Sequence, residues 1–257
     1  MSVGAPPPDH FSAVAGQYAS FRPRYPAALF EWLAGVAPRR GRVWDCACGS
    51  GQASLDLAAH FDSVIATDLS AAQLGQASAH ERIRYQLATA EQSDLESASC
   101  DLVTVAQALH WFDLPRFYAE VRRVLRPDGL LVVWCYGVAT IPELVGNALL
   151  QDYYDNIVGP YWPPERRLVE QGYRTLPFPE PEIEVPEFAL QLEWTLDELI
   201  GYASSWSATA RYTQAHGVNP IEPLRAAMLS QWGAAELRRT VTWPLSVRAA
   251  RAGALAG

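Results

Sequence analysis

The sequence contains no lysine, so all 20 of its basic residues are arginines. This absence excludes mechanisms that need a Schiff-base lysine or the lysine of a phosphate-binding loop. Basic residues are also fewer than the 28 acidic ones, which gives a formal net charge of -8. Because an acidic surface repels the phosphate backbone of nucleic acids, we expect no nucleic-acid partner.

The chain has only four cysteines and no apolar run of membrane-spanning length. Cys46 and Cys48 form a C-x-C pair, which is closer than the usual zinc or redox spacings. We therefore expect reduced, buried thiols and no metal site. Since the sequence shows neither a signal peptide nor a membrane segment, we expect a cytoplasmic protein without a membrane partner. No pattern specifies the oligomeric state.

The 257 residues permit one or two domains, and we expect one. Residues 26–137 alternate strand-like apolar runs with helical segments, which predicts a parallel sheet with helices on both faces. Residues 138–238 contain longer helical stretches rich in Trp and Tyr, and these predict a substrate cap. The runs 188–194 and 239–251 can each add a strand. The predicted fold class is α/β, a Rossmann-like, doubly wound, mostly parallel sheet of seven strands with a helical cap.

A glycine-containing turn follows the first of these strands. In VWDCACGSG, Asp45 ends the strand, and Gly49 and Gly51 lie in the turn that leads into a helix. Glycine lets the backbone approach a ligand closely, and a helix N-terminus favours a negative group. Two spaced glycines occur in many α/β proteins, so the turn alone does not identify the ligand.

A second carboxylate, Asp68, ends the next strand in VIATDLS. In dinucleotide folds such a carboxylate accepts hydrogen bonds from both ribose hydroxyls of an adenosine cofactor. The alternative is a helix-capping role in the DLS turn, where Ser70 is also placed to cap. Because ligands of open α/β sheets bind at the carboxyl ends of the strands, Asp68 and the glycine turn together favour a ligand site.

The stretch from Asp45 to Trp134 resembles the class I S-adenosylmethionine (SAM)-dependent methyltransferases of the methyltransferase type 11-like kind, especially the small-molecule branch similar to trans-aconitate methyltransferase. The resemblance implies methyl transfer from SAM to a small-molecule acceptor, with a carboxylate or a hydroxyl as the expected acceptor group. It also implies a set of cofactor contacts: Asp45 at the amino group, the backbone of Ala47, Gly49 and Gly51 along the methionine moiety, Asp68 on the ribose, Leu69 on the adenine, Ala90 and Glu91 in the adenine-binding turn, and Gln107 beside the sulfonium.

The segment YASFRPRYP resembles a lid of this branch, which places an N-terminal lid at about residues 11–25. In this resemblance Tyr18 and Arg22 contact the cofactor and Tyr25 the substrate. Arginines such as Arg24 and Arg211 are candidates to pair with an acidic substrate, because guanidinium binds carboxylates bidentately.

His110 and Trp111 follow the fourth strand, where this fold places the transferable methyl. His110 is the candidate catalytic base for a hydroxyl or amine acceptor, and a helix-capping role is the alternative. Trp111 and Trp206 are candidates to line the substrate pocket, although aromatic side chains in such positions are more often core.

Three positions depart from the family pattern: Ala47 replaces the usual first loop glycine, Thr89 replaces an acidic residue common in the adenine turn, and Asp128 with Gly129 replaces the usual Gly-Gly of the fifth-strand turn. An NAD-dependent oxidoreductase is one alternative, but its G-x-G-x-x-G fingerprint fails here at Ser54. A SAM-binding protein without catalytic activity is the other alternative, and the loss of the loop glycine motivates it.

Overall fold

The computed structural model describes residues 23–144 and 148–256, so Tyr18, Arg22 and most of the expected lid lie outside the described residues. The first part contains α2 (Ala27–Val36), β1 (Arg42–Cys46), α3 (Gln52–Ala58), β2 (Ser63–Asp68), α4 (Ala71–Leu74), β3 (Ile83–Leu87), β4 (Cys100–Ala106), the 3-10 turn η2 (Leu109–Trp111), α5 (Leu114–Val124) and β5 (Leu125–Tyr136). The second contains α6 (Ala148–Asp152), the π-helical turn η4 (Tyr153–Ile157), the 3-10 turn η5 (Gly159–Tyr161), α7 (Arg166–Glu170), β6 (Phe188–Trp194), α8 (Leu196–Ser204), α9 (Ser207–His216), α10 (Ile221–Trp232), β7 (Arg239–Arg251) and the 3-10 turn η6 (Ala252–Ala256).

The strands form one seven-stranded sheet in the order β3-β2-β1-β4-β5-β7-β6. Strands β1 to β5 pair in parallel, whereas β7 runs antiparallel to both β5 and β6. The predicted seven-stranded, mostly parallel sheet is therefore confirmed. The two late runs of the sequence, 188–194 and 239–251, are the strands β6 and β7.

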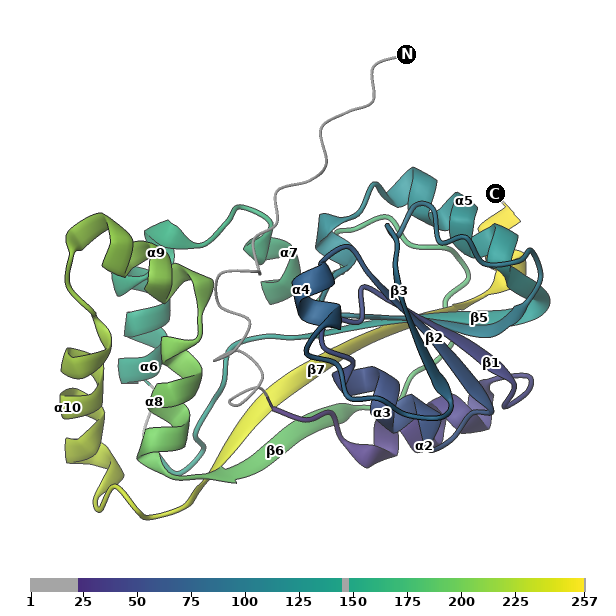
Figure 1. Ribbon diagram of the computed structural model, residues 1–257. Helices are drawn as coiled ribbons and strands as arrows, with labels where there is room; N and C mark the ends of the chain where they lie inside the picture. The colour runs from purple at the N-terminus through teal and green to yellow at the C-terminus, as the bar shows by residue number, and fades with distance from the viewer. Residues whose placement is uncertain (1–22, 145–147, 257) are drawn as a thin grey trace.

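Alternate residues of the central strands enter two different hydrophobic clusters, as the two-residue period of a strand requires. Leu102 and Val132 pack in the cluster that includes α2 and α3, whereas Val103 and Val133 pack in the cluster that includes α5. Figure 1 shows α2 and α3 on the lower face of the sheet and α5 above it. The helices thus cover both faces, as predicted.

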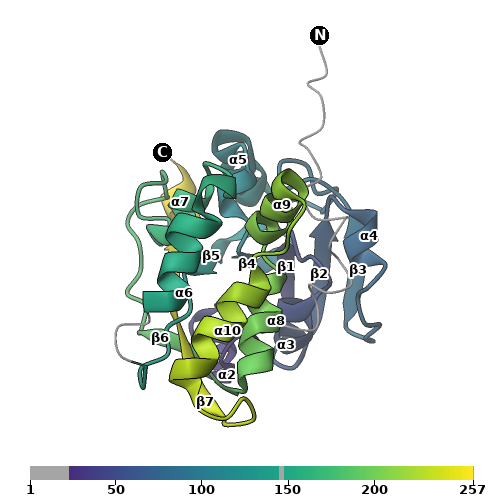
Figure 2. The same cartoon turned by 90° about the vertical axis from the view of Figure 1, so that its left-hand side faces the viewer.

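Helices α6, α8, α9 and α10 form a separate group beside the sheet, and Figure 2 shows them in front of the strands. We call this group, with η4, η5 and α7, the cap. Helix α8 begins with a complete capping box, in which the Glu198 carboxylate accepts a hydrogen bond from the Thr195 backbone N–H at 2.7 Å and Thr195 Oγ1 accepts one from the Glu198 N–H at 3.3 Å.

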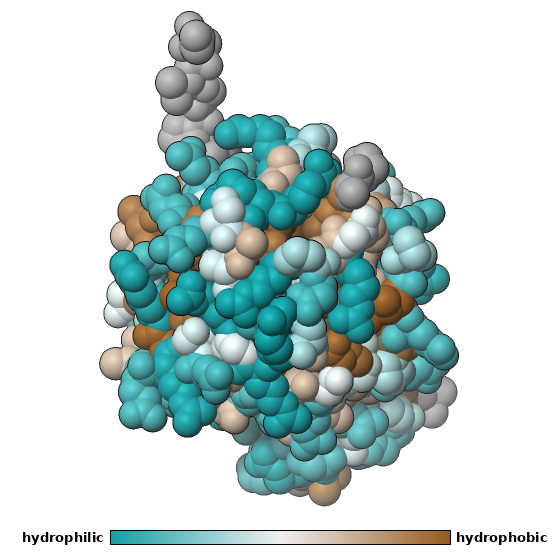
Figure 3. All heavy atoms as spheres, turned by 90° about the vertical axis from the view of Figure 1, so that its right-hand side faces the viewer, coloured by the Kyte–Doolittle hydropathy of each residue, from teal (hydrophilic) through white to brown (hydrophobic). Residues whose placement is uncertain are grey.

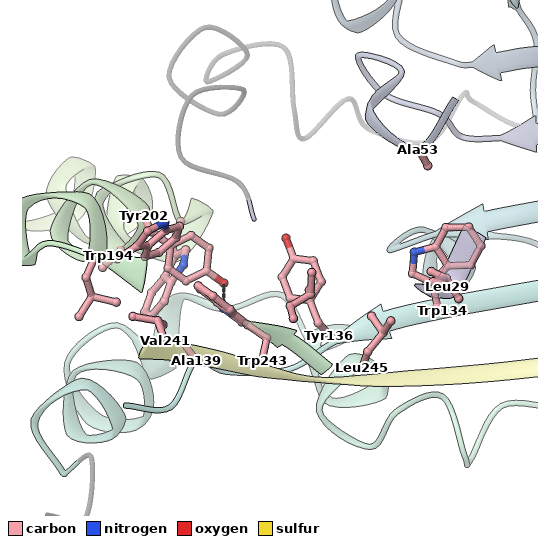
Figure 4. Close-up of a cluster of buried hydrophobic side chains, with 14 of the residues drawn as sticks. Leu29, Ala53, Trp134, Tyr136, Ala139, Trp194, Tyr202, Val241, Trp243 and Leu245 are labelled. Atoms are coloured by element: carbon pink, nitrogen blue, oxygen red, sulfur yellow. Dashed lines mark hydrogen bonds between the residues drawn. The ribbon is translucent and has the colours of Figure 1, made fainter. Parts of the chain in front are cut away.

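A continuous row of buried side chains joins the sheet to the cap. Figure 4 shows this row extending from Leu29 and Trp134 over β7 to Trp194 and Tyr202. Within it, Trp243 Nε1 of β7 donates a hydrogen bond to the Tyr202 hydroxyl of α8 at 3.2 Å. Strand β7 therefore belongs to the sheet at one end and to the cap at the other.

The opposite edge of the sheet, at the amino ends of the strands, is held by ion pairs. Asp101 is fully buried and accepts hydrogen bonds from Arg126 Nη1 at 2.8 Å, from Arg39 Nε at 3.2 Å and from the Arg42 N–H at 2.9 Å. Figure 3 shows the face of the molecule turned away from the cap, on which hydrophilic residues predominate. None of the helices in the described ranges is long and apolar enough to cross a bilayer.

Candidate functional site

The predicted cofactor residues follow strands that end side by side. Cys46, the last residue of β1, is aligned with Thr67 of β2 and with Val105 of β4, and Ala106 of β4 is aligned with Trp134 of β5. Because these strands are parallel and in register, the turns after them meet at one edge of the sheet. The cap lies beyond this same edge (Figure 1).

The turn after β1 has a backbone that only small residues tolerate well. Gly51 has φ of 80° at the start of α3, and a Cβ atom there would lie 2.8 Å from Tyr85 Cε1 and 2.9 Å from Tyr85 Cζ. Ala47 has φ of 56° in the same turn, a left-handed conformation that L-residues adopt at an energetic cost. The turn therefore keeps its shape despite the alanine at the first glycine position.

Asp68 fixes the glycine turn to the end of β2. Its Oδ2 accepts a hydrogen bond from the Gly49 N–H at 2.8 Å, and its Oδ1 accepts one from the Ser70 N–H at 2.8 Å. The cap of α4 is Ser70 rather than Asp68, because Ser70 Oγ accepts from the Gln73 N–H. Asp68 thus joins the two predicted cofactor segments, and Leu69 next to it is 44% exposed.

Asp45 lies beneath this turn and is fully buried. Its Oδ2 accepts a hydrogen bond from Ser54 Oγ at 2.5 Å, and its Oδ1 accepts one from Thr104 Oγ1 at 3.0 Å. Burial is the main reason why the pKa of Asp45 rises from 3.8 to about 6. Unlike the half-buried Asp68, Asp45 has no exposed surface, and both of its oxygens bind buried hydroxyls, so this side chain supports the turn from below.

Polar groups at this edge are buried without a hydrogen-bond partner among the described residues, and Gln107 and Tyr85 each carry one. Gln107 has φ of 61° after β4, and its N–H donates to the Trp134 carbonyl at 2.9 Å. Its Nε2, however, is buried and finds no hydrogen-bond acceptor in the part of the chain that the structure describes, and the Tyr85 hydroxyl is in the same state. Because buried polar groups are nearly always hydrogen-bonded, these two atoms fit a site that binds a polar ligand.

The predicted adenine turn lies beside the same edge. Ala90 is buried, and Glu91 Oε1 accepts a hydrogen bond from the Asp113 N–H at 3.1 Å. The N–H of Ala88 donates to the Asp68 carbonyl at 3.1 Å, which brings this turn next to Asp68. Thr89, at the position that is often acidic, forms an isolated bridge with Gln92.

His110 lies in η2 with its Nδ1 2.9 Å from the Tyr173 hydroxyl. Burial, and to a lesser extent the positive charge of Arg166, lowers the pKa of His110 to about 3. Burial also raises the pKa of Tyr173 well above its ordinary value, so its hydroxyl keeps its proton. Since this buried proton needs an acceptor, the His110 ring is neutral and its Nε2 carries the hydrogen. This arrangement makes His110 a weak base.

The three predicted substrate residues occupy different surroundings. Trp111 lies against His110, with ring centroids 4.6 Å apart. Tyr25 packs against Trp134 at 5.5 Å, at the end of β5. Trp206 is 8% exposed and belongs to an aromatic cluster of the cap. The structure thus places Trp111 and Tyr25 near the strand ends and Trp206 within the cap.

Several site residues escaped the sequence analysis. Tyr85, Tyr173 and Arg166 lie in no motif. Arg166 is followed directly by a second arginine, Arg167, and the sequence does not distinguish the two. Of the arginines proposed for an acidic substrate, Arg24 is exposed, and Arg211 Nη1 donates to the Tyr161 carbonyl at 3.2 Å. The described ranges hold no group of three His, Cys, Asp or Glu residues that could bind a metal ion.

The sheet order with a reversed seventh strand, together with a glycine turn bonded to the acid that ends β2, defines the class of SAM-dependent methyltransferases. Residues 44–133 match the family described as "Methyltransferase domain". The chain is also 33% identical over 227 residues to a protein of Dictyostelium discoideum named as a methyltransferase, with 87% of this chain and 86% of that protein covered. The chain therefore belongs to the methyltransferase family.

Solved structures agree with this assignment. A protein described as a type II methyltransferase from Anaeromyxobacter dehalogenans is 46% identical, with a TM-score of 0.85, 91% of this chain and 99% of that chain covered. A methyltransferase from an antibiotic biosynthesis pathway of Anabaena variabilis ATCC 29413 is 17% identical with a TM-score of 0.52, covers 86% and 98% of the two chains, and shares the fold alone. The protein is a SAM-dependent methyltransferase, and the NAD-dependent alternative and the alternative without catalytic activity are set aside.

Proposed function

We propose that this enzyme transfers the methyl group of SAM to an oxygen of a small-molecule acceptor at the strand edge between Asp68 and the cap. The observation that carries the proposal is the bond from the Gly49 N–H to Asp68, which holds the glycine turn and the carboxylate in one place. The membership of the family supports the reaction, and the geometry supports this location.

The residues at the edge suit the parts of the cofactor. We assign Asp68 to the ribose hydroxyls, the exposed Leu69 and the buried Ala90 to the adenine, and Gln107 to the region of the sulfonium. Asp45 is a positioning residue that supports the turn through Ser54 and Thr104. When bound, SAM supplies an electrophilic methyl group on a positively charged sulfur. The roles of Tyr18, Arg22 and Glu91 stay predictions.

The enzyme's main task in this reaction is positioning. The acceptor oxygen must be held about 3 Å from the methyl carbon and in line with the departing sulfur, so that the new C–O bond forms as the C–S bond breaks. A hydroxyl acceptor needs a base, and His110 with a pKa of about 3 is a weak one. A carboxylate is already ionised and needs none. The state of His110 therefore favours a carboxylate acceptor, to which the neutral ring can donate a hydrogen bond.

Four expectations from the sequence stay predictions beside this proposal. They are the closer likeness to trans-aconitate methyltransferase, the single-domain organisation, the absence of a nucleic-acid partner and the cytoplasmic location.

Titration calorimetry with S-adenosylhomocysteine tests the cofactor assignment. We expect Asp68→Ala to weaken binding by about 100-fold, because two hydrogen bonds to a charged group are lost. The control is Asp62→Ala, which removes an exposed carboxylate just before the other end of the same strand and leaves affinity unchanged. Equal affinity in the wild type and Asp68→Ala would remove Asp68 from the cofactor site.

A further inference from the structure

Among the described residues of the cap, Arg166 is the only cation whose guanidinium lies over two aromatic rings. Its guanidinium carbon lies 4.9 Å from the ring centroid of Trp162 and 5.5 Å from that of Tyr154. Its Nε donates to the Tyr154 hydroxyl at 2.6 Å, and that hydroxyl donates to Glu170 Oε1 at 2.6 Å. One edge of the guanidinium is therefore fixed, and the ring contacts fix its plane.

The other edge of the Arg166 guanidinium has no hydrogen-bond partner among the described residues. Neither Nη1 nor Nη2 forms a hydrogen bond or ion pair with any described residue. Trp162 Nε1, on the ring that Arg166 covers, is likewise buried and has no acceptor within residues 23–144 and 148–256. The unsatisfied groups at this place are all donors, and a cluster of donors without an acceptor fits an oxyanion.

Two other arginines of the protein, Arg248 and Arg123, bind protein acceptors with all of their guanidinium nitrogens. Arg248 uses Nε and Nη2 on Glu182, and its Nη1 on the carbonyls of Tyr173 and Leu176. Arg123 uses Nε and Nη2 on Glu120, and its Nη1 on the Leu95 carbonyl. Arg166 differs from these two arginines, and also from the half-buried Arg211, whose Nη1 donates to the Tyr161 carbonyl, because neither terminal nitrogen of Arg166 has such a partner in the described ranges.

Arg166 also lies close to the strand edge where the methyl group is transferred. One turn further along α7, the Val169 carbonyl accepts a hydrogen bond from Cys135 Sγ, near the end of β5, at 3.7 Å. Shortly after α7, the Tyr173 hydroxyl contacts His110 after β4. The positive charge of Arg166 is the second cause, after burial, of the lowered pKa of His110. These contacts place Arg166 on the cap side of the transfer site.

We propose that Arg166 and Trp162 bind the carboxylate of the methyl acceptor, so that the substrate class is a small organic carboxylate. The planar guanidinium offers two parallel N–H groups that match the two oxygens of a carboxylate, and Trp162 adds a third donor. Trp206, whose ring lies 5.8 Å from that of Trp162, can cover the apolar remainder of the molecule. The inference rests on the proposed function, because it names the acceptor of the same site.

The test measures binding of acids and their neutral amides to enzyme saturated with S-adenosylhomocysteine. The probes are glutarate and glutaramide, phenylacetate and phenylacetamide, and inorganic phosphate as an oxyanion without carbon. For the wild type, we expect at least one acid to bind about tenfold more tightly than its amide and more tightly than phosphate, which is the preference that one charge-assisted contact gives. We expect Arg166→Gln to reduce this preference to about twofold or less while keeping the affinity for S-adenosylhomocysteine.

Two variants separate binding from folding. Arg167→Gln removes an exposed arginine from the next position of α7, and we expect it to keep the preference for the acid. Trp162→Phe keeps a ring under Arg166 but removes the N–H, and we expect it to lower the preference by about threefold. A preference that survives in both Arg166→Gln and Trp162→Phe would overturn the proposal, as would a wild type that binds phosphate best or binds acids and amides equally. If the wild type failed to bind S-adenosylhomocysteine at all, that result would instead refute the proposed function itself.

Discussion

The two binding surfaces that we propose, one at the strand edge of residues 23–136 and one in the cap, consist of different kinds of groups. At the strand edge between β1 and β4, the glycine turn, the Asp68 bonds and the Gln107 backbone form the surface, so main-chain geometry dominates. In the cap, side chains dominate, because the surface consists of the stacked rings of Tyr154, Trp162 and Trp206 and one arginine.

Under the proposed function, this difference separates the surface for the cofactor, which is the same in every such enzyme, from the surface for the acceptor, which varies. A cofactor of fixed structure is well served by backbone geometry, which tolerates few substitutions. An acceptor that varies between enzymes is better served by side chains, which can change without moving the backbone. The match to the family model, confined to residues 44–133, covers the first half and stops before the cap.

The largest expected difference between the two regions is the loss of stability caused by substitution of Gly51. Gly51→Ala adds a methyl group at φ of 80°, 2.8 Å from the Tyr85 ring, whereas Gly217→Ala in the cap adds one at φ of 69° with nothing within 4 Å. We expect the first to lower the free energy of unfolding by roughly 4 kcal/mol and the second by about 1 kcal/mol, because only the first combines strain with a clash. Urea denaturation measures both. Equal losses would show that the turn after β1 has no special steric constraint.

The second prediction concerns the pH dependence of stability, because a carboxylate is buried beneath the strand edge whereas tyrosine hydroxyls are buried in the cap. With its pKa raised from 3.8 to about 6, folded Asp45 binds a proton at a pH where the unfolded chain does not. Its contribution to stability is therefore complete below about pH 4 and lost as the pH rises through 6. Relative to Asp45→Asn, we expect the wild type to lose roughly 2 kcal/mol of unfolding free energy between pH 4 and pH 7.

Tyr153→Phe is the matched control in the cap, where the Tyr153 hydroxyl bonds Thr209 at 3.0 Å. Burial raises the pKa of Tyr153 to about 12, so this residue stays neutral throughout the experiment. We expect its effect on stability to be the same at both pH values. His110 contributes with the opposite sign, since its lowered pKa costs stability as the pH falls from about 6.5 toward 3. Measuring Asp45→Asn and the wild type both in a His110→Gln background removes that contribution.

The smallest expected effect is on kcat/KM and concerns His110, which lies between the strand edge and the cap. We expect His110→Gln to lower kcat/KM by about threefold to tenfold, the loss of one hydrogen bond, without changing the shape of the pH profile between pH 5 and 8. The lowered pKa of His110 is the reason, because the ring does not titrate in this range. An acid limb near pH 6.5 that is present in the wild type and disappears in the variant would restore His110 as the base.

Much of the first half could be predicted from the sequence because its signals are local. The strand, turn and helix around Asp45 and the end of β2 at Asp68 lie in short segments with period-two apolar patterns and glycine in the turn. The parallel arrangement then requires the two turns to meet, and the bond from Gly49 to Asp68 shows that they do. The seven strands followed from the same local patterns.

The cap contacts could not be predicted because they join distant residues. The His110 contact with Tyr173 spans 63 residues and the Trp243 contact with Tyr202 spans 41, and neither has a local pattern. Arg166 and Arg167 are identical neighbours in the sequence, and only the direction each takes from a five-residue helix separates a stacked cation from an exposed one. The positive φ of Ala47 could be expected only from the glycine that the family usually has at this position, because alanine itself rarely adopts a left-handed conformation.

The position of β7 has a consequence for the order in which the chain folds. Strand β6 pairs with β7 and with no other strand in the described ranges, and β7 lies between β5 and β6 although it follows both in the sequence. During synthesis, strands β1 to β5 are complete and able to associate well before residues 239–251 leave the ribosome. Strand β6 can join the sheet only through that last strand, and Trp243 of β7 supplies one of the contacts that hold α8. The sheet of β1 to β5 can therefore begin to form before β6 and the adjoining side of the cap reach their final places.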